Sequence, residues 1–387
     1  MVNKTAEGQL SKIFNELADA LESGEYGSKT VVCVTTLGSE HGPEEVVRGA
    51  EIFKQQNKNT DVLLIGEKVE TELPYALETT SEKTAHEQME KLLKSGEAHA
   101  AVTMHYNFPI GVSTVGRVIT PSTGKEMLIA TTTGSSGMHR VEAMVKNAIY
   151  GISAAKSLGI EKPKLGILNV DGAKQVEKAL NNLKDNGYEI NFAQSGRSDG
   201  GVIMRGNDVL TGTPDIMVTD TLTGNILMKM FSAFTTGGSY ESLGYGYGPG
   251  VGENQDQVIN IVSRASGAPV IAGAMKFAAE SREGNLIEIC QDELKKAEKA
   301  GLSELLTSLK KDTSSSEEEE VTPPPKKPVT EEISGIDIME LEDACKVLWK
   351  KEIYAESGMG CAGPVVMVAK EDFEDAKKIV TDEGYLA

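Results

Sequence analysis

The chain alternates short apolar runs with glycine-rich turns and helical stretches, and this rhythm restricts its fold more than any other feature. Apolar runs typical of buried strands recur at residues 30–34, 61–65, 100–103, 127–131, 165–170 and 216–219. Helical patterns lie between several of these runs, for example at residues 44–56. Strands that alternate with helices predict a parallel sheet covered by helices. We therefore expect an α/β fold.

Length and charge narrow the classes of protein to consider. The chain has 387 residues, which is enough for more than one lobe with its own core. Its net charge of -19 argues against nucleic acid and anionic membranes as partners. No run approaches the roughly 18 apolar residues that a membrane span needs, and the first residues are polar. We expect a cytoplasmic protein that begins with a short amphipathic helix at residues 10–21.

The cysteines are few and widely spaced. The four of them are Cys33, Cys290, Cys345 and Cys361, and their spacing fits neither a metal site nor a disulfide framework. We therefore expect reduced cysteines and no metal. Cys33, Cys290 and Cys345 lie in or beside apolar runs, which favours packing roles for these three.

A polar tract divides the chain. Residues 314–320 are serine and glutamate, and residues 323–328 are proline and lysine. Such a tract has no apolar face to bury and predicts an extended tether. The expected domains are an N-terminal helix at 1–28, a main domain at 29–310, a disordered acidic and proline-containing linker at 311–331, and a C-terminal module at 332–387.

The C-terminal module carries the most suggestive cysteine. We expect a helix at residues 339–354, a glycine-rich turn at 356–364, a strand at 365–369 and a last helix at 372–380. Cys361 lies between Gly360 and Gly363 in this turn. An accessible thiol near free backbone N–H groups is what an acyl-accepting nucleophile requires, because the N–H groups can stabilise the oxyanion. A small buried cysteine in a strand-entry turn is the alternative interpretation.

Two segments of the main domain have the composition of anion sites. Small hydroxyl and glycine residues fill 131–137, ahead of a helix expected at 138–158 that begins with His139 and Arg140. Free N–H groups at such a helix start can bind an anion, although an ordinary capped turn explains the pattern equally well. The second segment, residues 258–267, ends an apolar run with Ser263 and Arg264. Arginine presents a planar fork suited to phosphate, although a surface arginine at a strand end is also common.

A third segment is more specific. At residues 215–229 an apolar strand runs into Asp220, and we expect a turn made of Thr223, Gly224 and Asn225 before a helix that carries Lys229. Ligands of open α/β sheets bind at the carboxyl ends of strands, where these residues would lie. The alternative is a capped turn with a solvent-facing lysine. Residues 237–250 are so rich in glycine that we expect a flexible loop or lid, with Tyr245 and Tyr247 on it.

The main domain resembles a known enzyme family. Residues 38–50, 159–169 and 215–229 are similar to successive landmarks of bacterial phosphate acyltransferases, and residues 258–267 are similar to the Ser-Arg stretch of phosphate acetyltransferases. The likeness covers roughly residues 30–280. It implies an isocitrate/isopropylmalate-dehydrogenase-like architecture, with two α/β lobes around a cleft. Residues 35–40 depart from the acyltransferases' Asp- and Gly-rich first turn, which argues against a long-chain acyl-carrier-protein reaction.

The tail points to a narrower family. An acyltransferase-like domain, an acidic tether and a terminal turn around Cys361 together resemble the alpha subunits of component C of the glycine/sarcosine/betaine reductase complex. The resemblance implies that Cys361 receives an acetyl group, which inorganic phosphate releases as acetyl phosphate with no bound cofactor. It also implies two partners: the component C beta subunit, and the selenoprotein component A carrying a carboxymethyl group.

Site roles follow as expectations. Backbone N–H groups from Gly360 to Gly363 would stabilise the oxyanion, and Ser263 and Arg264 would hold phosphate. The residues expected to assist phosphate binding are Thr223, Gly224 and Asn225. The candidates to lower the pKa of the thiol are His41, His105 and His139.

Three other functions compete with this hypothesis. A phosphate acetyltransferase that uses CoA would keep its activity without Cys361. A non-catalytic docking subunit with a degenerate acyltransferase domain would have no acyl-transfer activity. Hydride transfer is disfavoured, because no GxGxxG turn follows a strand with an acidic residue about 20 positions later.

Overall fold

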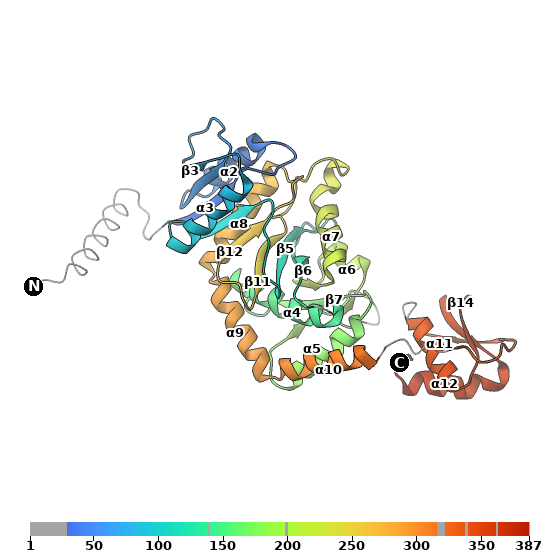
Figure 1. Ribbon diagram of the computed structural model, residues 1–387. Coiled ribbons are helices and arrows are strands. Elements are labelled where there is room, and N and C mark those ends of the chain that lie inside the picture. Colours follow the sequence, from blue (N-terminus) through green and yellow to red (C-terminus); the bar gives the residue numbers. More distant parts are fainter. Residues whose placement is uncertain are drawn as a thin grey trace, which may run out of the picture. The chain divides into compact units, whose positions relative to one another are not determined.

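The chain forms two compact units, Met1–Leu309 and Lys310–Ala387, which we call the N-terminal and C-terminal units. The computed structural model (Figure 1) describes residues 29–137, 139–197, 200–315, 322–336, 340–360 and 363–386. The helix expected at residues 10–21 lies outside the described residues.

The N-terminal unit is built on one twelve-stranded sheet with two parallel halves. The strands of the first half, in spatial order, are β3 (Tyr75–Glu78), β2 (Thr60–Gly66), β1 (Thr30–Thr35), β4 (Ala100–Thr103) and β12 (Val258–Ile261). Those of the second half are β6 (Glu126–Gly134), β10 (Ile216–Val218), β7 (Lys164–Leu168) and β8 (Asn191–Phe192), with β9 (Ile203–Met204) also pairing with β7. The α/β class expected from the alternating pattern is confirmed.

Two antiparallel strands join these halves, so the sheet as a whole is mixed, and the expected parallel pairing holds within each half. β11 (Gly248–Gly252) pairs antiparallel with both β12 and β5 (Val112–Ile119), and β5 pairs antiparallel with β6. The two-lobed, dehydrogenase-like description stays a prediction.

Helices pack against each half of the sheet around separate apolar cores. The first half is covered by α2 (Pro43–Gln56), α3 (Glu82–Ser95) and α8 (Ala268–Glu283). The helices of the second half are α4 (Arg140–Ser157), α5 (Ala173–Asp185), α6 (Gly206–Thr211), α7 (Thr221–Ala233), α9 (Leu286–Lys299) and α10 (Leu302–Ser315), with the 3₁₀ turn η1 (Phe234–Thr236) after α7. The strands expected from apolar runs are all present, with ends that differ by at most three residues from the predicted ones.

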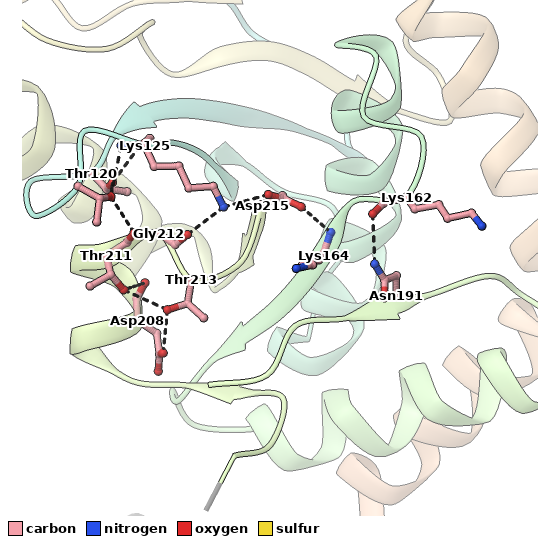
Figure 2. Close-up of polar contacts among 11 residues, drawn as sticks. Thr120, Lys125, Lys162, Lys164, Asn191, Asp208, Thr211, Gly212, Thr213 and Asp215 are labelled. Carbon is pink, nitrogen blue, oxygen red and sulfur yellow. Dashed lines mark hydrogen bonds and ion pairs between the residues drawn. The ribbon is translucent and has the colours of Figure 1, made fainter. Parts of the chain in front are cut away.

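At the amino ends of β7 and β10, a polar network fixes the loops to one another (Figure 2). The Nζ of Lys125 donates to the carbonyl of Gly212 at 3.0 Å and pairs with Asp215 at 3.0 Å. The second carboxylate oxygen of Asp215 accepts from the backbone N–H of Lys164 at 2.8 Å. The loops at the amino ends of these two strands are therefore fixed to one another by internal contacts.

The C-terminal unit is a small three-stranded antiparallel sheet with two helices. Its strands are β13 (Glu331–Ser334), β14 (Ala355–Gly360) and β15 (Gly363–Val368), in the order β13-β15-β14. α11 (Leu341–Lys350), the 3₁₀ turn η3 (Lys370–Asp372) and α12 (Phe373–Asp382) complete it. Its core is formed by Val366 and Val368 of β15 against Leu348 and Val380 of the helices.

Two glycine-rich segments form strands where we expected loops. Residues 355–360 pair along β15, and residues 248–252 form β11 between two neighbouring strands. Glycine is a poor strand former by itself, but a strong neighbouring strand supplies the backbone partners. The expected turn at 356–364 is therefore wrong at residues 356–360 and 363–364, and the expected loop at 237–250 is wrong at residues 248–250.

The expected linker at 311–331 is too long at both ends. α10 continues to Ser315, and Lys326 and Lys327 pair with Glu356 and Asp372 of the C-terminal unit, both at 2.9 Å. β13 then begins at Glu331. Residues 316–321 lie outside the described residues.

Candidate functional site

The end of β12 presents the first candidate site. β12 is the last strand of the parallel half, with β4 on one side and antiparallel β11 on the other. Ser263 and Arg264 lie two and three residues after its end. Ligands of open α/β sheets bind in the crevice outside the carboxyl ends of strands.

Arg264 is held by its backbone, and its side chain is exposed. Its carbonyl accepts a hydrogen bond from the N–H of Glu40 at 2.8 Å. Within the described part of the chain, no carboxylate forms an ion pair with its guanidinium. An arginine fixed in place but unpaired retains all its donors for an anion.

A small pocket at the carboxyl ends of β1 and β4 adjoins Arg264. Polar side chains line it from several elements: Thr35, Glu82, His86, Thr103, His105 and Arg264. The hydroxyl of Thr35 donates to Thr103 Oγ1 at 2.8 Å, and His86 Nε2 lies 3.1 Å from the same oxygen. The pocket therefore brings a cation, two imidazoles and the Glu82 carboxylate together.

The imidazole of His86 is biased towards its neutral form. Burial lowers the pKa of His86, with His105 acting in the same direction and Glu82 and Glu90 opposing. A neutral imidazole can accept a proton during a reaction, which an imidazolium cannot. The sequence analysis did not select His86, because a lone histidine in a polar stretch gives no signal. Its position on α3 opposite β4 is apparent only in the fold.

The side chain of Ser263 contacts residues outside the Arg264 pocket. Its side chain is buried and accepts from the N–H of Ala265 at 3.2 Å. It also hydrogen-bonds Tyr247, whose hydroxyl contacts Lys229 of α7. Burial raises the pKa of Tyr247, and Lys229 opposes that shift. The phenol thus links Lys229 to the end of β12, a connection that sequence spacing did not reveal.

The segment Thr223-Gly224-Asn225 is the first turn of α7 rather than a loop. Asp220 caps this helix, accepting from the N–H groups of Leu222 and Thr223 at 3.1 Å. The hydroxyl of Thr223 donates to Asp220 at 2.6 Å, and Asn225 donates to the carbonyl of Thr132 at 3.1 Å. The expected turn is therefore wrong, and the polar side chains of the segment are engaged within the fold.

Gly224 has a packing role. It is buried where α7 crosses β6, and a Cβ at this position would overlap the carbonyl oxygen of Thr131. Glycine is required here for the close approach of helix and strand.

The hydroxyl groups of residues 131–137 are also used internally. Thr131 donates to the carbonyl of Thr114 at 2.6 Å, Thr132 donates to the carbonyl of Tyr247 at 2.8 Å, and Ser136 donates to Asn147 at 2.5 Å. Arg140 pairs with Asp171 at 3.0 Å. These contacts use the hydroxyl groups within the fold, which argues against an anion site. The N-cap residue of α4, His139, forms no side-chain cap hydrogen bond, so the capped-turn alternative is not observed either.

The three histidines proposed to activate the thiol are dispersed. His105 lines the pocket beside Arg264. His41 Nε2 lies 3.2 Å from the carbonyl of Ala265, and His139 is exposed at the start of α4. His105 and His41 therefore both lie beside the Ser263-Arg264 segment, and His139 lies on a different element.

Three of the four cysteines are buried and unreactive. Burial raises the pKa of Cys33 to about 12 and the pKa values of Cys290 and Cys345 to about 11. A thiol with such a pKa has almost no thiolate at neutral pH and is a poor nucleophile. Their expected packing roles are therefore consistent with the structure.

Cys361 itself lies outside the described residues. The strands that flank it in the sequence are described: β14 ends at Gly360 and β15 begins at Gly363, and these two glycines are the last pair of the ladder. The roles of Cys361, Gly360 and Gly363 stay predictions.

Comparison with known proteins identifies the family. The family described as "Fatty acid synthesis protein" matches residues 30–367. The component C alpha subunit of the glycine/sarcosine/betaine reductase complex of Peptoclostridium acidaminophilum is 59% identical over 379 residues, which are 98% of each chain. The chain belongs to this family of component C alpha subunits. The resemblance inferred from the motifs is confirmed.

More distant relatives match a smaller share of the chain. The phosphate acyltransferase of Thermotoga maritima is 25% identical over 230 residues, 51% of this chain and 68% of the relative. Among solved structures, a branched-chain phosphotransacylase from Enterococcus faecalis V583 covers 65% of this chain and 99% of its own, with 16% identity and a TM-score of 0.46. The sequence match to the phosphate acyltransferase supports a phosphate-acyltransferase-like body in this chain. In the described part of the chain, no helix is both long and apolar enough to cross a membrane.

Proposed function

We propose that this chain is the acyl-transfer subunit of the reductase complex. Cys361 accepts a two-carbon acyl group as a thioester, and inorganic phosphate releases it as acetyl phosphate. The observation that carries the proposal is that the other three cysteines are buried with raised pKa values, in a chain with a phosphate-acyltransferase-like body.

The chemistry needs one thiol and one oriented anion. An oxygen of HPO₄²⁻ attacks the carbonyl carbon of acetyl-Cys361 and forms the new C–O bond. The carbonyl π electrons move to oxygen, and collapse of the tetrahedral intermediate expels the Cys361 thiolate with the C–S electron pair. Acetyl phosphate leaves with the phosphate proton, so charge and atoms balance. Thioesters suit this exchange because the thiolate is a good leaving group.

Phosphate has to be held against the negative charge of the protein. The net charge of the chain is -19, so a local cation is required. Arg264 is exposed, fixed by its backbone and unpaired within the described part of the chain, and we assign it to phosphate together with Ser263. His86 and His105, in the adjoining pocket, are placed to hydrogen-bond phosphate or to take up a proton. Thr223, Gly224 and Asn225 are not assigned to phosphate, because their contacts serve α7.

The source of the acyl group and the partners are part of the proposal. The 59% identical relative from Peptoclostridium acidaminophilum is a component of a reductase complex. We propose that the selenoprotein component A delivers a carboxymethyl group and that the component C beta subunit takes part in its conversion to the acetyl thioester.

A mass-spectrometric experiment tests the thioester. The purified chain is incubated with acetyl phosphate, digested at low pH and searched for an acetyl group on each cysteine-containing peptide. The expected result is label on the Cys361 peptide, which hydroxylamine removes. Cys345→Ala is the matched control, since Cys345 is a buried cysteine of the same unit, and it should leave the label unchanged.

Other outcomes separate the competing functions. Label on a different cysteine reassigns the nucleophile. Phosphorolysis of acetyl-CoA that survives Cys361→Ala indicates a CoA-dependent phosphate acetyltransferase. Absence of label with or without the beta subunit indicates a docking subunit.

A further inference from the structure

The glycine-rich tract before β11 is folded against the loop at residues 262–267 that follows β12, which we call the β12 loop. Glu241, within the tract, forms an isolated parallel bridge with Ser266. Its backbone N–H donates to the carbonyl of Ala265 at 3.4 Å, and its carbonyl accepts from the N–H of Gly267 at 2.9 Å. The tract is therefore fixed to the β12 loop through its backbone.

The side chain of Glu241 adds a further connection. It is 7% exposed, and its carboxylate accepts a hydrogen bond from the hydroxyl of Ser266 at 2.9 Å. Ser266 is also buried, and its N–H donates to the carbonyl of Ser263 at 3.0 Å. A buried carboxylate is tolerated only where donors replace the water that it loses. Because the donor here belongs to the same turn as Ser263, the carboxylate fixes that turn.

A second segment, at the start of α2, holds the same loop. The N–H of Glu40 donates to the carbonyl of Arg264 at 2.8 Å. Glu45 accepts from the N–H of Ala268 at 2.8 Å, and also from the hydroxyl of Tyr240 at 2.5 Å. Tyr240 belongs to the glycine-rich tract, so the two segments that hold the β12 loop are joined to each other.

Arg264 depends on this framework for its direction. Its side chain is exposed at the edge of the pocket at the ends of β1 and β4. An exposed side chain takes its direction mainly from its backbone, because few neighbours restrict it. A displacement of about 1 Å in a group that orients a substrate can cost about 100-fold in rate. The contacts that fix the β12 loop therefore bear directly on the anion that Arg264 holds.

We propose that Glu241 is a positioning residue for Arg264: it holds the β12 loop in the conformation in which the guanidinium reaches phosphate. The inference rests on the proposed function, which assigns Arg264 to phosphate. The role of Glu241 is indirect, since a carboxylate repels phosphate. It acts through the hydroxyl of Ser266 and through the backbone of the loop.

The rate at which phosphate removes acetyl from the acetylated full chain tests this role. Glu241→Ala should lower the rate by about 10-fold or more and raise the phosphate concentration that gives the half-maximal rate, because the guanidinium is displaced. Glu241→Gln should stay within about three-fold of wild type, because glutamine keeps an oxygen that accepts from Ser266. Circular dichroism and denaturation curves give the conditions in which each variant is fully folded. A loss in Glu241→Gln equal to that in Glu241→Ala contradicts the proposal.

Asp208→Ala is the matched control. Asp208 is also buried, and its carboxylate accepts from the hydroxyl of Ser195 at 2.7 Å and from the N–H of Gly196 at 2.9 Å. It fixes a loop in the same manner, within the polar network of Figure 2. This variant should lose stability and keep the wild-type rate when folded. An equal loss of rate in Asp208→Ala would assign the effect to general loosening and overturn the proposal.

A double variant separates this inference from the proposed function. In an Arg264→Gln background, Glu241→Ala should lower the rate by less than about three-fold, because effects that act through one group do not add. Additive losses overturn the positioning role alone, and so does a wild-type rate in Glu241→Ala when Arg264→Gln is slow. A wild-type rate in Arg264→Gln contradicts the phosphate site and the positioning role with it.

Discussion

Two strand ends of the same sheet look alike in sequence and differ in structure. The end of β12 leads into Ser263-Arg264, and the end of β10 leads into Asp220 and the segment Thr223-Gly224-Asn225. At β12 the guanidinium of Arg264 is left unpaired in the described part of the chain. At β10 the polar side chains cap α7 or bind β6. Polar residues at a strand end therefore indicate a ligand site only where the fold has not already used their donors.

The largest expected effect is a loss of stability on substituting Gly224, in the segment that follows β10. Gly224→Ala would force a Cβ against the carbonyl oxygen of Thr131, so α7 would have to move away from β6. We expect a loss of about 3 kcal/mol or more in the free energy of unfolding, the upper range for overpacking. Chemical denaturation measures it. If Gly224→Ala unfolds at the wild-type denaturant concentration, close packing of α7 on β6 is not the role of this glycine.

The next largest effect is a loss of activity on substituting Arg264, which follows β12. Arg264→Gln should lower arsenate-dependent hydrolysis of acetyl phosphate by about 100-fold, the typical cost of removing a preorganised donor to a developing charge. The free energy of unfolding should change little, because the side chain is exposed. Arg140→Gln is the control, an exposed arginine whose charge pairs with Asp171. Equal loss of activity in the two variants would mean that general charge, rather than a site at β12, is responsible.

A smaller effect separates capping from binding. Thr223→Val removes the hydrogen bond to Asp220 and should cost about 1 kcal/mol of stability, as loss of a helix cap does. Acyl transfer should stay within a few-fold of wild type once the protein is fully folded. A large rise in the KM for phosphate, with stability unchanged, would return this segment to the phosphate site.

The smallest effect concerns pH. Because burial lowers the pKa of His86 below its ordinary 6.5, the unfolded chain binds the proton more readily than the folded chain. Stability should therefore fall as pH decreases through about 6.5 and below. His86→Gln should flatten part of this slope, while His99, whose pKa is also lowered by burial, retains the rest. Melting temperatures between pH 5 and 7.5 test this, and an unchanged slope would contradict it.

The sequence predicted the strands better than the site because apolar runs report burial directly. Runs such as residues 100–103 became strands at their expected positions. Segments 248–252 and 355–360 became strands because neighbouring strands pair with them, and no local pattern of glycine shows that. The linker ends were missed for the same reason: Lys326 and Lys327 are fixed by carboxylates distant in sequence.

The candidate site residues also differ in whether a local sequence motif or only the fold indicates them. Ser263 and Arg264 were predicted from a strand-end motif, and their role in binding phosphate stays a prediction. His86 and Tyr247 were missed because their roles depend on α3 meeting β4 and on β11 meeting β12. The error at Thr223-Gly224-Asn225 arose because small polar residues start helices as readily as they form turns.

A single-turnover measurement tests the central claim, that acetyl on Cys361 is released by phosphate held through Arg264. The chain is first acetylated with acetyl phosphate and desalted, then mixed with phosphate, quenched over time and assayed by mass spectrometry for acetyl-Cys361. We predict rapid, phosphate-dependent loss of acetyl from the wild type and loss about 100-fold slower from Arg264→Gln at equal initial labelling. Equal rates in the two proteins, or a rate independent of phosphate, would contradict the account.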